Sequence, residues 1–123
     1  MNVKTDTKEK FTVITPISEH IPANMTGELE DLLLSYQNRE IPHIILNLSG
    51  VQKLDQKAGE KIAEIQQKFY DNNISFIVCE LQKEPEEMLD HMKLLEVMNV
   101  TPTVSEAWDI VQMEEIEREL NDD

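Results

Sequence analysis

The chain has 123 residues, which is enough for one domain that buries its own core without disulfides. Its 25 acidic residues against 11 basic ones give a formal net charge of −14. This charge argues against binding to nucleic acid or anionic membranes, because contacts to phosphate need a basic patch. The one cysteine, Cys79, lies in the apolar run "ISFIVC", and no stretch reaches the roughly 18 apolar residues of a membrane helix. Since the N-terminus also has no signal-peptide core, we expect a cytoplasmic protein without membrane insertion.

The N-terminal third is expected to form two strands and a helix. Residues 3–6 are a weak strand candidate, and residues 7–10 form a polar turn. Residues 11–17, "FTVITPI", are rich in β-branched side chains and predict a strand with Pro16 at its end or at a sheet edge. Residues 18–24 are expected to be a loop. A helix follows, with apolar residues spaced by three and four along one face: Met25, Leu29, Leu32, Leu33 and Tyr36.

Two apolar runs in the middle of the chain predict the centre of a sheet. Residues 43–48, "HIILNL", and residues 74–79, "ISFIVC", are apolar almost throughout, as strands buried on both faces are. Between them Asp55 is placed to cap a helix with one apolar stripe, which consists of Ala58, Ile62, Ile65 and Phe69. A helix joining two such strands favours a right-handed crossover, so we expect the strands to be adjacent, parallel and central.

The C-terminal part is expected to add a helix, an edge strand and a last helix. The first helix has Pro85 in its opening turn and a buried face formed by Met88, Met92 and Leu95. Residues 99–104 form a short edge strand that a proline interrupts. Ser105 then caps a helix whose inward side chains are Ala107, Trp108, Ile110 and Val111. We expect a domain over residues 1–113, followed by an acidic C-terminal helix extension or tail over residues 114–123.

These elements predict an α/β fold: a single domain with a mixed four- to five-stranded sheet and about four helices. Nothing in it points to a catalyst. His20, His43 and His91 fall in separate elements without metal-binding spacing, so structural or exposed roles are expected and no metal site. No nucleotide or nucleophile motif occurs, which predicts no cofactor and no enzyme. A small enzyme that uses buried carboxylates stays open as an alternative, and it would need an acid-lined pocket with raised pKa values.

The stretch "REIPHIILNLSGVQKLDQKAGEKIAEIQQKFYDNNISFIVCEL" resembles the STAS domain, the fold of bacterial anti-sigma-factor antagonists. Members typically have an apolar strand, a loop, Asp-Ser-Ser/Thr-Gly opening a helix, and a second apolar strand. Asp55 matches the family aspartate without a gap, and "HIILNL" and "FIVC" match the flanking strands. The segments "ELEDLL" and "MLDHMKLLEVMNVTPTVSEAW" extend the resemblance, which covers roughly residues 1–113.

The resemblance implies a switch that this sequence has lost. In the family's antagonists, the serine or threonine two residues after the aspartate is phosphorylated by the anti-sigma factor, a serine kinase. Here Gln56 and Lys57 occupy the hydroxyl positions, and Ala58 the glycine position. Phosphoserine would add about −1.5 to −2 charges beside the aspartate, whereas Lys57 places a fixed positive charge there. The alternative interpretation is that Lys57 is an exposed residue on a surface whose function has drifted.

We therefore expect a non-enzymatic protein–protein interaction module resembling an anti-sigma-factor antagonist, without the phosphorylatable residue. The predicted partner-binding surface consists of Lys53, Asp55, Gln56, Lys57 and Glu60, of which Gln56 and Lys57 form the degenerate phosphorylation site. The resemblance implies as partner an anti-sigma factor, a histidine-kinase-like serine kinase or another signalling protein. The alternative in the same fold is a soluble STAS subunit docked to a transporter or a larger signalling complex.

Overall fold

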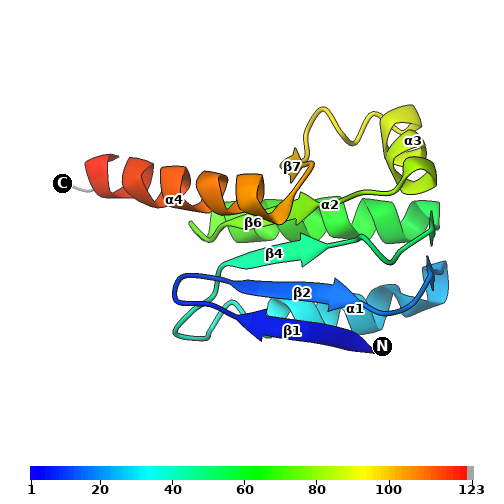
Figure 1. Cartoon of the computed structure of the whole chain (residues 1–123), viewed down its shortest axis with the longest axis horizontal. Coiled ribbons are helices and arrows are strands. Elements are labelled where there is room, and N and C mark those ends of the chain that lie inside the picture. The colour runs from blue at the N-terminus through cyan, green and yellow to red at the C-terminus, as the bar shows by residue number, and fades with distance from the viewer. Residues whose placement is uncertain (122–123) are drawn as a thin grey trace.

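The computed structural model describes residues 1–121 and contains one main sheet with helices on both faces (Figure 1). The sheet has five strands in the order β1-β2-β4-β6-β7. β1 pairs antiparallel with β2, and all other neighbours are parallel. The bounds are β1 Val3–Thr7, β2 Thr12–Pro16, β4 Ile44–Asn47, β6 Phe76–Cys79 and β7 Val100–Thr101. The prediction of a mixed α/β fold is confirmed, with β4 and β6 adjacent, parallel and away from both edges.

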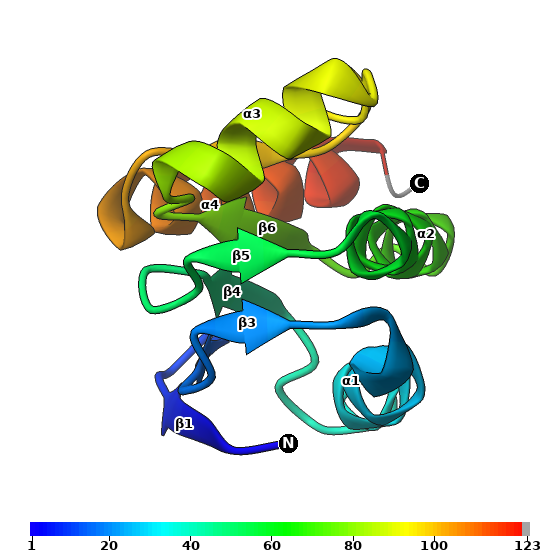
Figure 2. The same ribbon diagram turned by 90° about the vertical axis from the view of Figure 1, so that its right-hand side faces the viewer.

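Two helices cover one face of this sheet, α1 (Thr26–Leu34) and α2 (Gln56–Asp71), and Figure 2 shows them side by side. The predicted stripe of α2 is confirmed, since all four of its residues are fully buried. They pack with Leu29 and Leu33 of α1 on the strand residues that point to this face. Phe69 meets the ring of Phe76 edge-on, with ring centroids 5.2 Å apart.

The other face is covered by α4 (Val104–Asn121). Ala107 and Val111 pack on Ile45, Ile77 and Cys79 in a second apolar cluster. Phe11 and Trp108 extend this cluster, with ring centroids 4.8 Å apart. Burial raises the pKa of the Cys79 thiol to about 12, so this cysteine stays protonated and acts as a small apolar side chain.

The N-terminal cap of α4 is Thr103 and not Ser105, so that prediction was wrong. The helix begins at Val104, and the backbone N–H of Glu106 donates to Oγ1 of Thr103 at 3.1 Å. Since Ser105 already lies inside the first turn, its hydroxyl stands too far along the helix to serve as the cap.

Helix α3 (Lys83–His91) is shorter than its apolar pattern predicted. Its buried residues are Pro85 and Leu89, and Met88 is partly buried. Lys93 has a φ of 62°, a left-handed conformation that prevents the helix from continuing. Met92 and Leu95 therefore lie after the helix, and Leu95 contacts the core from the loop.

A second, small sheet lies where we expected only loops. β3 (His20–Ile21) pairs in parallel with β5 (Lys53–Leu54), as Figure 2 shows. A short 3-10 turn, η1 (Ala23–Met25), joins β3 to α1. The ladder connects the segment after β2 to the segment that leads into α2, and so fixes the start of α2 against the N-terminal part of the chain.

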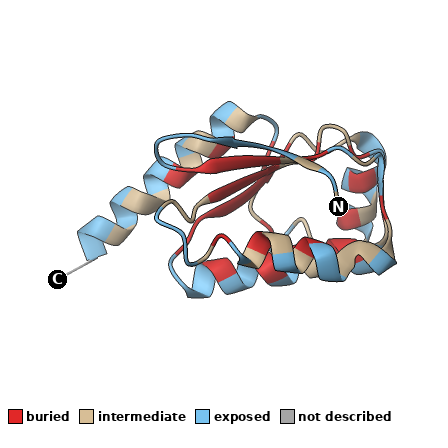
Figure 3. Ribbon diagram, turned by 90° about the horizontal axis from the view of Figure 1, so that it is seen from below, coloured by how far each residue is buried: buried red, intermediate tan, exposed pale blue. Residues whose placement is uncertain are grey.

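The last turns of α4 extend past the sheet (Figure 1), and the helix has no buried residue after Val111 among those described. Figure 3 shows this end as exposed or half-buried. The proposed boundary at residue 113 falls inside α4. Whether residues 114–123 form a separate extension of the domain stays a prediction, and residues 122–123 lie outside the described part of the chain. Over residues 1–121, no helix combines the length and the apolarity that crossing a membrane requires.

Candidate functional site

The predicted surface lies at the carboxyl end of the parallel strands, where β5 leads into α2. Four of its five residues are exposed: Lys53, Gln56, Lys57 and Glu60. The fifth, Asp55, is half-buried at the N-cap position of α2, with an extended backbone. The residues are consecutive or one turn apart, so the structure places them together on one end of the domain. That they bind a partner stays a prediction.

The side chain of Asp55 does not cap α2, which corrects the sequence-based expectation. Its Oδ1 lies 2.8 Å from Nε2 of His20, and its Oδ2 accepts a hydrogen bond from the backbone N–H of Ala23 at 3.0 Å. Asp55 joins the helix only through its backbone carbonyl, which accepts from the N–H of Gly59 at 3.0 Å. The cause is the β3–β5 ladder, because it brings residues 20–23 within reach of the carboxylate.

These two hydrogen bonds also set the charge of Asp55. The bond with His20, followed by the bond from the Ala23 N–H, lowers the pKa of Asp55 below its ordinary value. The carboxylate therefore stays anionic at neutral pH. Sequence reasoning missed His20 as part of this site, because it lies 35 residues before Asp55 in a segment with no strand pattern.

The first turn of α2 is also held from above by α3. Ala58 and Gly59 are both buried. A Cβ atom at residue 59 would lie 2.9 Å from Cδ2 of Leu89 and 3.2 Å from Cε of Met88, closer than ordinary van der Waals contact. The close approach of α3 therefore leaves little room for a Cβ atom at residue 59, while residue 58 accommodates a methyl group.

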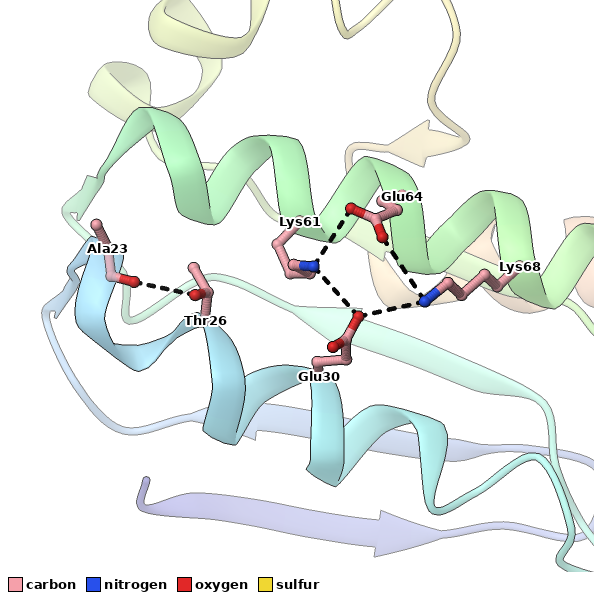
Figure 4. Close-up of polar contacts among 6 residues, drawn as sticks. All are labelled: Ala23, Thr26, Glu30, Lys61, Glu64 and Lys68. Carbon is pink, nitrogen blue, oxygen red and sulfur yellow. Dashed lines mark hydrogen bonds and ion pairs between the residues drawn. The ribbon is translucent and has the colours of Figure 1, made fainter.

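Further along α2, an ion-pair network joins it to α1 (Figure 4). Oε2 of Glu30 on α1 lies 3.3 Å from Nζ of both Lys61 and Lys68, and Glu64 lies near both lysines on α2 itself. The hydrogen bond from Lys61 and then that from Lys68 lower the pKa of Glu30. Over residues 1–121, Lys57 takes part in no ion pair of this kind, so its charge remains available at the surface.

The same region contains a hydroxyl that is already engaged. Oγ1 of Thr26, in the first turn of α1, donates to the backbone carbonyl of Ala23 at 3.0 Å (Figure 4). This bond supports the turn that carries the N–H donor to Asp55. Thr26 therefore strengthens the support of the site from the α1 side.

The three histidines lie in three different environments. His20 is paired with Asp55, Nδ1 of His43 accepts from the backbone N–H of Ser75 at 3.0 Å, and His91 is exposed on α3. Within the described residues, no three histidine, cysteine or carboxylate side chains gather to hold a metal ion. The pKa values of Glu30 and Asp55 are displaced downward, whereas a carboxylic acid catalyst needs an upward shift.

The family assignment follows from residues 2–107, which match the STAS domain. The match covers most of the chain, so the chain belongs to the STAS domain family. No curated protein sequence matches it.

Solved structures with the same fold come from several kinds of protein. A Thermotoga maritima protein is similar with a TM-score of 0.79 and 19% identity, over 89% of this chain and 94% of that one. An anti-sigma factor antagonist from Mycobacterium paratuberculosis gives 0.75 and 16%, over 90% and 93%. The murine anion transporter Slc26a9 gives 0.68 and 13%, over 85% of this chain and 18% of the transporter. At these identities the similarities establish the fold.

Proposed function

We propose that this chain is a non-enzymatic interaction module of the anti-sigma-factor-antagonist kind that binds its partner through the start of α2. The contact surface is the one formed by Lys53, Asp55, Gln56, Lys57 and Glu60. The observation that carries the proposal is the engagement of the Asp55 carboxylate by His20 and by the Ala23 N–H. It anchors the first turn of α2, whose outward side chains remain exposed. A preorganised exposed surface loses little entropy when a partner binds.

The partner class we infer is an anti-sigma factor or a histidine-kinase-like serine kinase. Many members of this family respond to such a kinase through a hydroxyl where this chain has Lys57. Because lysine cannot accept phosphate from a serine kinase, the contact here is constitutive, or another event regulates it. Lys57 adds a positive charge that attracts a carboxylate of the partner, where a phosphoserine would repel it.

A charge reversal at residue 57 tests the contact. The chain is titrated with a purified anti-sigma-factor serine kinase at low salt, and the affinity of Lys57→Glu is compared with that of the unchanged protein. An exposed charge pair is worth about 0–1 kcal/mol, and loss of one partner of a desolvated pair costs about 2–5 kcal/mol. We expect weaker binding within this range.

Lys8→Glu is the matched control. Lys8 is exposed in the turn between β1 and β2, at the other end of the sheet from the start of α2 (Figure 1). Lys8→Glu changes the net charge by the same amount as Lys57→Glu, and the ion pair that it removes is the surface pair between Lys8 and Asp6. Equal affinities for Lys57→Glu and Lys8→Glu would show that the start of α2 is not the contact surface.

Phosphate transfer gives a second, independent test. Incubated with the kinase and ATP, the chain should take up no phosphate on residues 55–59, which peptide mapping by mass spectrometry can verify. Lys57→Ser should bind more tightly than Lys57→Glu, and the same mapping on this variant shows whether a hydroxyl at residue 57 restores phosphate transfer. Thr101 is a poor alternative acceptor, because it is buried and its Oγ1 donates to the carbonyl of Thr103, while Ser49 is half-buried.

The fold shared with Slc26a9 supports one second candidate, a subunit that docks on a membrane transporter. This candidate places the chain in the membrane fraction of cells, from which a transporter should co-purify with it. The antagonist proposal instead predicts co-purification with a kinase or an anti-sigma factor.

A further inference from the structure

The C-terminal half of α4 carries large apolar side chains where the helix meets solvent. Met113 is 58% exposed, Ile116 55% and Leu120 77%. Their spacing of three and four residues aligns them in one row, which we call the α4 stripe. Isolated exposed apolar residues are common, but a contiguous row on one helix face marks a contact surface.

The α4 stripe contributes nothing to the core of the domain. Ala107 and Val111 face the sheet, and a rotation of about 100° per residue places the stripe on the opposite side of the helix from Val111. The stripe also lies on the part of α4 that extends past the sheet (Figure 1). It is therefore accessible along its whole length, as a partner helix would need.

The charges beside the stripe indicate what can cover it. Residues 114–119 contain Glu114, Glu115, Glu117 and Glu119 against a single arginine, Arg118. Arg118 lies 3.8 Å from Glu114, and Lys10 lies 3.5 Å from Glu115. Glu117 and Glu119 border the stripe, and neither forms an ion pair with a basic residue within the described chain. A second copy would bring the same glutamates into contact, with a formal net charge of −14 on each chain.

We propose that the α4 stripe binds an amphipathic helix of a partner protein, with aliphatic residues on its contact face and lysine or arginine along the borders. Aliphatic side chains would cover Met113, Ile116 and Leu120, while the basic borders would meet Glu117 and Glu119. Helices pair in this way in coiled coils, where apolar seams supply the affinity and flanking charges select the partner. This surface is separate from the start of α2, so the domain could hold two partners at once.

The test uses a defined probe, a synthetic amphipathic peptide with leucine at the a and d heptad positions and lysine elsewhere. Its affinity for the full chain is measured by fluorescence anisotropy, at peptide concentrations where the peptide alone is monomeric. The same peptide with glutamate in place of lysine should not bind. The double variant Ile116→Gln, Leu120→Gln should bind the lysine peptide at least about tenfold more weakly, because it loses two buried aliphatic contacts and keeps every charge.

Val97→Gln is the control, since Val97 is an aliphatic residue outside α4 that is 76% exposed, close to the 77% of Leu120. It should leave the affinity unchanged. Both double-variant positions are more than half exposed, so a urea melt should show unchanged stability. If the double variant nevertheless unfolds, Met113→Gln alone takes its place and should weaken peptide binding in the same direction.

Two results would overturn the proposal. Equal peptide affinity for the unchanged chain and the glutamine variant would mean that the acidic surface attracts any cationic peptide. In sedimentation velocity, a dimer of the free chain that the glutamine variant converts to a monomer would mean that a second copy covers the stripe.

Discussion

Replacing Gly59 by alanine measures how tightly α3 packs on the start of α2. The added Cβ would lie 2.9 Å from Cδ2 of Leu89 and 3.2 Å from Cε of Met88. Both atoms are ends of side chains, but Leu89 is fully buried and its neighbours restrict where it can move. The substitution therefore forces a local rearrangement at the helix start that presents Gln56 and Lys57.

Two effects of opposite sign determine the size of the change. Alanine is favoured over glycine inside a helix by about 1 kcal/mol, whereas overpacking a core costs about 1–3 kcal/mol. Gly59→Ala should thus change the free energy of unfolding by between roughly zero and a loss of 2 kcal/mol. A net value this small cannot reveal the clash by itself, so the clash has to be isolated from the helix propensity.

A double-mutant cycle with Leu89→Ala separates the two effects. Without the Leu89 side chain, alanine at residue 59 should stabilise the protein, and the coupling between the sites should be about 1–3 kcal/mol. Urea unfolding followed by far-UV circular dichroism gives the four free energies. Gly27→Ala is the control, because Gly27 lies in α1 with nothing within 4 Å of an added Cβ, and it should show the propensity gain alone. Additivity within about 0.5 kcal/mol would refute the close approach of α3.

The remaining predictions concern the core and pH. Ile65→Ala should lower the free energy of unfolding by about 2–5 kcal/mol because Ile65 is fully buried. Glu64→Ala should lower it by only about 0–1 kcal/mol, since this change removes surface ion pairs alone. Similar losses for the two variants in urea melts would contradict the assignment of the buried face of α2. Burial lowers the pKa of His43 below its unfolded value, and protonation would place a hydrogen on the Nδ1 that accepts from Ser75. Stability should therefore fall as the pH drops below about 6.5. Urea melts across this pH range should show a weaker dependence of stability on pH for His43→Gln than for the unchanged protein.

The parts of the fold that the sequence predicted are those with a local apolar pattern. The continuous runs at residues 43–48 and 74–79 are paired interior strands because both their faces are covered. The buried face of α2 was also predicted by the sequence, since four apolar residues recur at helical spacing. β3 and β5 could not be predicted in this way, because each has only two residues and a period-2 pattern needs more.

At the candidate site, too, the sequence around Asp55 predicted its position but not its contacts with residues far away in the chain. The gap-free match of Asp55 to the family aspartate nominated the surface, and the position of Asp55 just before the apolar helix stripe predicted that its side chain caps the helix. The actual partners of Asp55 come from residues 20–23, and the short β3–β5 ladder that brings them close has no sequence signature. The requirement for a small residue at Gly59 could not be predicted either. This requirement depends on the position of Leu89, which no local pattern shows.

The inward turn of Asp55 has a consequence for the charge at the start of α2. Because no side chain caps the helix, its first N–H groups keep their partial positive charge, and Lys57 adds a full positive charge in the same turn. In an antagonist that can be phosphorylated, a phosphoserine at this position would instead oppose the partial positive charge of the helix start. Lys53 and Lys57 balance the charges of Asp55 and Glu60 at this end of the domain, although the chain as a whole has a formal net charge of −14. If the start of α2 is the contact surface, as we propose, an acidic residue of the partner is repelled less here than by the acidic remainder of the chain, which favours a single orientation of binding.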